Sequence, residues 1–228
     1  EACVLAAGKA HVDLKKIRYL FGGDLLRQGI ATSMGVEALQ IPMFGLYGAC
    51  STSGEALALA SMSAAAGYGG TMIAVTSSHF GSAEKEFRFP LGYANQRPLS
   101  SHWTVTGSGA FLVQSAEEYR KQNTKSYFSN IRITGVTVGK IVDYGLKDSQ
   151  NMGACMAPAA MDTIVQNFQD MERKEKDYDR IITGDLGSIG RTILFDLIRE
   201  KVHDICEKHM DCGMTIFDKE RQDTHAGG

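Results

Sequence analysis

A largely uncharged stretch in the first half of the chain predicts two buried strands with a helix between them. MFGLYGAC (residues 43–50) predicts a strand that ends in a tight turn at Gly48, and STSGEALALASMSAAAG (51–67) predicts a helix. TMIAVTS (71–77) is almost continuously apolar, as parallel strands buried on both faces are. Strands that alternate with helices in this way predict an α/β fold with a parallel sheet.

The predicted helix over 51–67 carries no polar stripe after Glu55, since its remaining positions are Ala, Leu, Ser, Met and Gly. A helix that is apolar all round is buried all round. We therefore expect it to lie between two sheets, with small side chains that allow close approach. A membrane span is the competing interpretation for such a helix, and its Ser and Gly content and the flanking strands argue against it.

The hexapeptides LFGGDL (20–25) and IITGDL (181–186) resemble each other, and each is predicted to end a strand. A helical stretch precedes each of them, and another helix follows each. This matching helix–strand–helix context makes duplication of an α/β unit a better account than chance. The helical stretches are 1–10 and 28–40 around the first hexapeptide, and 157–171 and 188–202 around the second.

The duplication predicts two halves, residues 1–128 and 129–228. A strand pair over 104–106 and 109–114, and a further strand over 133–143, join them. Two such halves with buried helices between their sheets predict a layered α/β/α/β/α architecture.

The charge balance is nearly neutral, with 24 Lys+Arg against 26 Asp+Glu and a formal net charge of −2 over 228 residues. This balance lacks the clustered basic excess that nucleic acids and anionic membranes require, which argues against both classes of partner. No apolar run reaches the length of a spanning helix, and we expect no signal peptide. The five cysteines contain no CxxC pair, which predicts a reducing compartment without a disulfide framework or zinc site.

Cys50 follows the predicted strand at the start of the apolar helix, where unpaired backbone N–H groups and the helix dipole favour a thiolate. An acyl-accepting nucleophile needs this arrangement. The alternative is a small buried cysteine that fills space beside Gly48 and Ala49. Glu55, one helical turn further on, brings a negative charge that works against the thiolate.

The segment from Ser78 to Trp103 shows no convincing periodicity and is longer than most structureless connections, which favours a functional loop. It contains donors suited to a small dianion, because Arg presents a planar fork to a carboxylate and His supplies an N–H. Arg88 is the best of them because Phe87 and Phe89 would hold it near the core, whereas Lys85 and its acidic neighbours predict a solvated turn. These donors are His79, Lys85, Arg88, Arg97 and His102.

Seven segments, in order along essentially the whole chain, resemble the stage V sporulation protein AD family, a branch of the thiolase-like fold. The segments are GDLLRQ, FGLYGACSTSGEALALAS, VTSSHFGSAEKEFRFP, WTVTGSGA, DSQNMGACMAPAAMDTI, ITGDLGSIG and KHMDCGMTIF. The resemblance implies a protein that binds dipicolinic acid (pyridine-2,6-dicarboxylic acid) without turning it over. It also implies a role in loading this acid into the developing spore, as the soluble subunit of the SpoVA membrane channel assembly.

The resemblance places Cys50 at the position of the nucleophile of condensing enzymes, whose partner residues supply neutral donors to an oxyanion. In this chain the loop where a partner His is expected contains Gly184, Asp185 and Leu186, and an ionised Asp185 would repel an oxyanion. The alternative role for Asp185 is the N-cap of the helix that begins near Ser188. We therefore expect no catalysis and no cofactor. The competing hypothesis is a condensing or acyl-transfer enzyme with Cys50 as its nucleophile.

The candidate ligand-binding residues are Cys50, His79, Arg88, Asp185 and His209. His209 and Cys212 resemble half of a metal site, but no second pair accompanies them, so we expect no metal. By resemblance we expect a homodimer that associates, only through channel partners, with the cytoplasmic side of the forespore or spore inner membrane. The family pattern also predicts that the chain lacks an N-terminal strand region and a C-terminal helix.

Overall fold

The computed structural model describes residues 1–79, 98–122 and 131–227, except for the side chain of Arg27. These residues fall into two compact units. Unit 1 comprises residues 1–79, 106–122 and 131–134, and unit 2 comprises residues 98–105 and 135–227. The predicted duplication into residues 1–128 and 129–228 stays a prediction.

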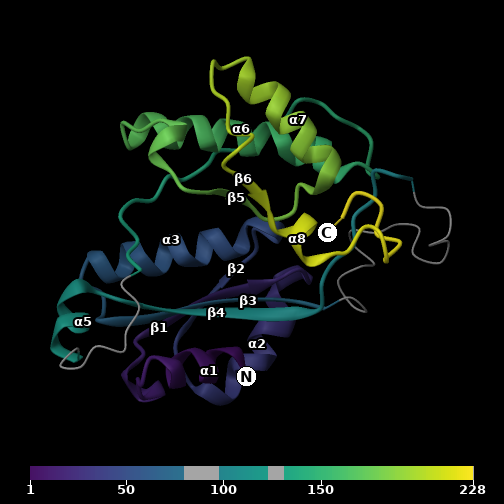
Figure 1. The fold of residues 1–228 in the computed structure, drawn as a ribbon. Helices are drawn as coiled ribbons and strands as arrows, with labels where there is room; N and C mark the ends of the chain where they lie inside the picture. Colours follow the sequence, from purple (N-terminus) through teal and green to yellow (C-terminus); the bar gives the residue numbers. More distant parts are fainter. Residues whose placement is uncertain (80–97, 123–130, 228) are drawn as a thin grey trace. The chain divides into compact units, whose positions relative to one another are not determined.

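Four strands form the sheet of unit 1. They are β1 (Tyr19–Asp24), β2 (Met43–Leu46), β3 (Thr71–Ser78) and β4 (Gly107–Gln114). Their order in the sheet is β2–β1–β3–β4 (Figure 1). β1 is parallel to β2 and β3, which confirms the predicted parallel sheet, and β4 is antiparallel to β3. The strand predicted over 104–106 has no counterpart, because β4 begins at Gly107.

Helices cover both faces of this sheet (Figure 1). α1 (Ala2–Lys9) and α2 (Ile30–Val36) lie on one face and α3 (Thr52–Ala65) lies on the other, while α5 (Ala116–Gln122) follows β4. Each face therefore has its own buried cluster. The cluster under α1 contains Cys3, Ala7, Leu20, Ile73 and Val75, and the cluster under α3 contains Phe21, Ala56, Ala60, Met72 and Ala74.

Helix α3 is buried along one side only, so the prediction that it is buried all round was wrong. Its buried positions recur every fourth residue, which places them in one stripe against β1 and β3. A sheet covers only one side of a helix, and Met62 on another side of α3 is 50% exposed. The buried positions are Thr52, Ala56, Ala60 and Ala64.

Unit 2 is built on a pair of parallel strands, β5 (Ile181–Thr183) and β6 (His209–Asp211). α6 (Met152–Asp170) and α7 (Gly187–Arg199) pack against each other, and the short α8 (Cys212–Ile216) follows β6. The strand at the second hexapeptide and the helices on either side of it confirm the predicted helix–strand–helix unit.

Two glycines allow α6 and α7 to approach each other closely. A Cβ atom added to Gly153 would lie 2.6 Å from the Leu186 carbonyl oxygen and 2.8 Å from the Gly190 nitrogen. Leu194 and Ile198 of α7 are completely buried in the cluster that this approach creates. The glycines thus bring the start of α7 into a fixed position beside α6.

The segment 133–143, predicted as a strand, forms no strand in the part of the chain that the structure describes. Most of it lies along α6 instead. Asn167 Nδ2 donates to Thr137 Oγ1 at 2.9 Å, and Lys140 Nζ pairs with an Asp162 carboxylate oxygen at 2.9 Å. The segment therefore contacts α6 through side chains and lacks the backbone pairing that defines a strand. The prediction of a strand here was wrong.

Candidate functional site

Cys50 lies in a one-turn 3₁₀ helix, Ala49–Ser51, between β2 and α3. Its side chain is exposed, so the alternative of a buried, space-filling cysteine was wrong. The residue that needs a left-handed backbone here is Ala49, with φ of 47°, and not Gly48. Thr52 holds the turn, because its hydroxyl accepts from Gly48 N at 3.1 Å and donates to the Ala49 carbonyl oxygen at 2.8 Å. The turn therefore presents the thiol at the start of α3.

A carboxylate lies close to this turn. A Cβ atom added to Gly48 would lie 2.8 Å from Glu55 Oε2 and 2.6 Å from Ser51 Oγ. In the sequence Glu55 follows Cys50 by about one helical turn. In the structure its carboxylate lies beside Gly48, two residues before Cys50. A negative charge in this place opposes formation of a thiolate.

The first hexapeptide contains a buried acid, Asp24, which is only 3% exposed. Its carboxylate accepts from Leu26 N at 2.8 Å and from Thr32 N at 2.7 Å. It thus fixes the turn after β1 and satisfies an N–H in the first turn of α2. Sequence reasoning identified this aspartate as part of a repeat but gave it no role.

Asp211, at the end of β6, is the centre of the polar cluster of unit 2. The residue is 3% exposed, and its carboxylate accepts four hydrogen bonds. Through them it joins the starts of α7 and α8 to β5, as an anion does when it occupies helix N-termini. The donors are Thr183 Oγ1 at 2.6 Å, Leu186 N at 2.9 Å, Gly187 N at 3.0 Å and Met214 N at 3.2 Å. Sequence reasoning missed this role of Asp211.

His209 is buried beside this cluster and is a neutral ring. Burial first, and then the charge of Arg191, lower the pKa of its imidazole. Its Nε2 lies 3.0 Å from Thr183 Oγ1, whose own proton is donated to Asp211. The Thr183 oxygen must therefore accept, so Nε2 of His209 carries the proton and Nδ1 does not. The Nε2–H of His209, which was predicted as a ligand-binding residue, thus donates to the Thr183 hydroxyl.

Asp185 is not the N-cap of α7, so that alternative was wrong. The helix begins at Gly187 after Leu186, and the carboxylate that accepts from both of these backbone N–H groups belongs to Asp211. Asp185 instead acts on the thiol that follows β6. Burial first, then Asp211 and Asp185, raise the pKa of Cys212, which favours its thiol form.

The structure divides the predicted ligand-binding residues between the two units. Cys50 and the exposed His79, which follows β3, belong to unit 1, whereas Asp185 and His209 lie around β5 and β6 in unit 2. Arg88 lies outside the described residues, as do Lys85 and Arg97. His102 is 4% exposed in unit 2, and a Cβ atom added to Gly187 would lie 2.8 Å from its Nε2.

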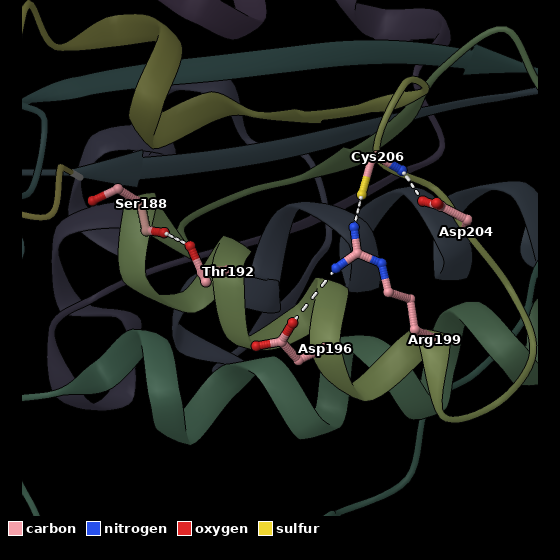
Figure 2. A network of polar contacts seen from close by, with 6 residues as sticks. All are labelled: Ser188, Thr192, Asp196, Arg199, Asp204 and Cys206. Atoms are coloured by element: carbon pink, nitrogen blue, oxygen red, sulfur yellow. Dashed lines mark hydrogen bonds and ion pairs between the residues drawn. The ribbon is translucent and has the colours of Figure 1, made fainter.

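Cys206 is held at the far end of α7 by the network drawn in Figure 2. Arg199 Nη2 donates to its Sγ at 3.0 Å, and the same guanidinium pairs with Asp196 at 3.6 Å. Cys206 N donates to Asp204 Oδ1 at 2.9 Å. Burial first, then Asp204, raise the pKa of the Cys206 thiol, so it anchors the turn after α7 as a neutral group.

Within residues 1–79, 98–122 and 131–227, no three His, Cys, Asp or Glu side chains gather as metal ligands do. The helices of the same residues include none whose length and apolar character suit a membrane span. The chemical groups of interest are therefore the exposed thiol of Cys50 at the start of α3 in unit 1 and the buried carboxylate of Asp211 in unit 2. The Asp211 carboxylate already accepts four hydrogen bonds.

The family model described as stage V sporulation protein AD (SpoVAD) matches the whole chain, residues 1–228. The chain is 40% identical over 228 residues to the stage V sporulation protein AD of Bacillus subtilis (strain 168). All of the chain is covered, and it spans 64% of the length of that relative.

Solved structures of thiolase-like enzymes share the fold. A variant of OleA from Xanthomonas campestris aligns with a TM-score of 0.60 at 12% identity, over 92% of this chain and 64% of that chain. The 3-oxoacyl-[acyl-carrier-protein] synthase III from Aquifex aeolicus aligns with a TM-score of 0.54 at 12% identity, over 90% and 65% of the two chains. These likenesses confirm the predicted thiolase-like fold class, and at such identities they concern the fold alone.

Proposed function

Because the chain belongs to the stage V sporulation protein AD family, we propose that it is a non-catalytic, ligand-binding protein of bacterial sporulation. Its ligand in this proposal is dipicolinic acid, pyridine-2,6-dicarboxylic acid. The protein supports uptake of this acid into the developing spore as a subunit of the SpoVA channel assembly.

The observation that supports a non-catalytic role is the commitment of the hydrogen-bond donors around Asp211. The backbone N–H groups of Leu186 and Gly187, at the start of α7, donate to its carboxylate, and the Nε2–H of His209 donates to Thr183. Catalysis of acyl transfer requires donors that are available to a developing oxyanion. At this helix start an oxyanion would meet a carboxylate in place of available donors.

Calorimetry with dipicolinate tests the ligand. We expect saturable binding to the folded protein, and weaker binding of pyridine-2-carboxylate, because this analogue lacks the second carboxylate that a protein donor would bind. Arg88→Ala should reduce the affinity for dipicolinate far more than Lys85→Ala. Absence of heat at millimolar dipicolinate would contradict the proposal, whereas equal small effects of the two variants would place the ligand away from Arg88.

A condensing or acyl-transfer activity is the second candidate, and the exposed thiol of Cys50 at the start of α3 favours it. Incubation with an acyl-CoA followed by intact-mass measurement distinguishes the two functions. The enzyme hypothesis requires an acyl adduct that is absent from Cys50→Ala. The ligand-binding proposal expects no adduct on either protein.

We further propose that the protein acts as a homodimer and reaches the cytoplasmic face of the forespore or spore inner membrane through other SpoVA proteins. Light scattering after size-exclusion chromatography tests the dimer. Fractionation of sporulating cells with and without the other SpoVA proteins tests the membrane association. Equal recovery of the protein with the membrane in both strains would contradict attachment through those partners.

A further inference from the structure

Arg191, in the second turn of α7, carries a positive charge for which the described residues supply no carboxylate. The residue is half-buried, and its Nε–H group is fully buried without a hydrogen-bond partner in the described part of the chain. The acids of α7 and β6 bind other groups. Asp196 pairs with Arg199 at 3.6 Å, and Asp211 accepts from Thr183 and three backbone N–H groups. A cation that loses water on burial needs a charged partner to offset the cost, so Arg191 is available to an anion.

Phe195 brings Arg191 and His209 together at one side of unit 2. Arg191 Cζ lies 4.9 Å from the centre of the Phe195 ring, and this cation–π contact holds the guanidinium in place. The same ring meets the His209 ring edge-on, with centroids 5.2 Å apart and planes at 86°. Arg191 and Phe195 are one helical turn apart on α7, whereas His209 begins β6. The helix and the strand thus place a cation and an imidazole against one aromatic ring.

His209 adds a buried acceptor to this arrangement. The residue is 8% exposed, and its Nδ1 has no hydrogen-bond partner among residues 1–79, 98–122 and 131–227. Its Nε2 carries the ring proton, because the Thr183 hydroxyl donates its own proton to Asp211. Nδ1 is therefore a bare lone pair, which only a donor can satisfy. Burial first, and then the charge of Arg191, lower the pKa of the imidazole, so the ring stays neutral beside the guanidinium.

The two groups require a ligand that both accepts and donates. The Arg191 guanidinium needs an acceptor, and its planar fork of N–H groups matches a carboxylate. Nδ1 of His209 needs a donor, which a hydroxyl group provides. Arg191 and His209 make no direct hydrogen bond to each other in the structure, although an N–H and a lone pair would bond on contact. A molecule that lies between them has to carry both functions.

We propose that Arg191 and His209 form a binding site for a small hydroxycarboxylate, whose carboxylate accepts from the guanidinium and whose hydroxyl donates to Nδ1 of His209. Phe195 provides an apolar surface for the carbon chain between the two functions. The ligand enters from the side of Arg191, because that residue is half-exposed whereas His209 is buried.

The chemistry of this site differs from that of the ligand in the proposed function. The dipicolinate dianion carries acceptors only, two carboxylates and a ring nitrogen, so it offers nothing to a bare Nδ1. The inference therefore goes beyond the proposed function and does not depend on it. Calorimetry with both ligands distinguishes the two, because dipicolinate should not displace the hydroxycarboxylate. Displacement would overturn the separate site and leave the proposed function standing.

Calorimetry with matched acids tests the two contacts. Glycolate and 3-hydroxypropionate are the probes, and acetate and propionate are their counterparts without a hydroxyl. We expect at least one hydroxy acid to bind about tenfold or more tightly than its counterpart. Arg191→Gln should weaken its binding by about tenfold or more, because a charged hydrogen bond is lost. The control is Arg173→Gln, since Arg173 also lies over an aromatic ring, that of Tyr178 at 5.8 Å, but is exposed.

His209→Gln separates the hydroxyl contact from the carboxylate contact. Its amide can still donate toward Thr183 but offers no acceptor at the position of Nδ1. This variant should bind the hydroxy acid and its counterpart equally. Binding of neither hydroxy acid at millimolar concentration, or equal effects of Arg191→Gln and Arg173→Gln, would overturn the proposal. So would a preference for the hydroxyl that persists in His209→Gln.

Nitrogen-15 NMR of the histidine-labelled protein gives a readout that needs no change at His209. One bare imidazole nitrogen should move to a hydrogen-bonded position when the hydroxy acid is added, and not when its counterpart is added. Arg191→Gln should show no such movement at the same concentration. Should His209→Gln fail to fold, this comparison decides. A movement that is equal in the parent and in Arg191→Gln, or no movement in the parent, overturns the proposal.

Discussion

The Thr183 hydroxyl donates a hydrogen bond to Asp211 at 2.6 Å, and these two residues are also register partners on the parallel strands β5 and β6. The pair lies at the carboxyl ends of the strands, where the backbone N–H groups of the following helices point toward it. Asp211 therefore serves as an internal anion for unit 2, with Thr183 and His209 fixed behind it.

Replacement of Asp211 by Ala should destabilise the protein strongly. The change removes the acceptor of two helix starts, each worth about 1 kcal/mol, and leaves the Thr183 hydroxyl without its acceptor. We expect the free energy of unfolding to fall by about 2–4 kcal/mol, measured by urea denaturation followed by circular dichroism. Asp196→Asn on the exposed side of α7 is the control, with an expected change within about 0.5 kcal/mol. Equal losses in the two variants would contradict the central role of Asp211.

Gly153→Ala should lower stability although alanine favours helices. The new methyl group would meet the Leu186 carbonyl oxygen at 2.6 Å, so α6 and α7 must move apart, at a cost of about 1–3 kcal/mol. Gly54→Ala in α3 is the matched helical control, because a Cβ atom there meets nothing within 4 Å. It should raise stability by about 0.5–1 kcal/mol. Thermal denaturation of both variants checks this, and a stabilised Gly153→Ala would show that the helices are not in contact at this glycine.

Alkylation should distinguish the thiols by burial and charge. Cys3 is buried, and burial raises its pKa, so it should react slowest with iodoacetamide in the native protein. The Cys212 residue is exposed overall, but partial burial of its thiol, and then Asp211 and Asp185, raise its pKa. Its labelling should therefore increase at higher pH than that of an ordinary exposed thiol. Asp185→Asn should accelerate labelling of Cys212 at pH 8, as followed by peptide mass mapping. An unchanged rate would mean that the Asp185 charge does not act on this thiol.

The hydrogen bond between Glu175 and His203 should contribute to stability at neutral pH and not in acid. A backbone hydrogen bond first, and then His203 Nδ1 at 3.2 Å, lower the pKa of Glu175. A group whose pKa is lowered by folding stabilises the protein at pH values above its pKa in the unfolded state. This contribution disappears as the pH falls through its pKa in the folded state. Glu175→Gln should therefore melt below the parent at pH 7, with a loss of about 0.5 kcal/mol for this partly exposed pair. The difference in melting temperature should shrink as the pH falls from 5 to 3, and a constant difference would argue against the pair.

The sequence pattern predicted the elements well and their partners poorly. The hexapeptides that contain Asp24 and Asp185 both include the end of a strand, as their repeated letters indicated. Asp24 caps the next helix, but in unit 2 that role belongs to Asp211, 26 residues later in the sequence than Asp185. Which carboxylate reaches a helix start depends on the neighbouring strand, and a local pattern carries no information about that neighbour.

The same limit explains two further errors. The segment 133–143 has strand-like composition, yet a strand exists only where another strand pairs with it, and its Thr137 and Lys140 contact α6 instead. The apolar composition of α3 indicated burial but not from how many sides. The sequence predicted the strand-to-helix turn at Cys50. It did not predict the left-handed backbone of Ala49, because the neighbouring Gly48 was the expected turn residue.

The parallel bridge between His102 and Gly227 constrains the order in which the protein can fold during synthesis. Ser101 and His225, which lie in contact beside this bridge, are 124 residues apart, and residues 98–105 precede β4 of unit 1 on the ribosome. At about 5–20 residues per second, the 98–103 segment waits roughly 6–25 s for its partner. During this interval unit 1 can complete its sheet with β4, while unit 2 has no complete set of contacts. Translation speed across residues 135–227 thus sets how long the buried surface of His102 stays uncovered in the nascent chain.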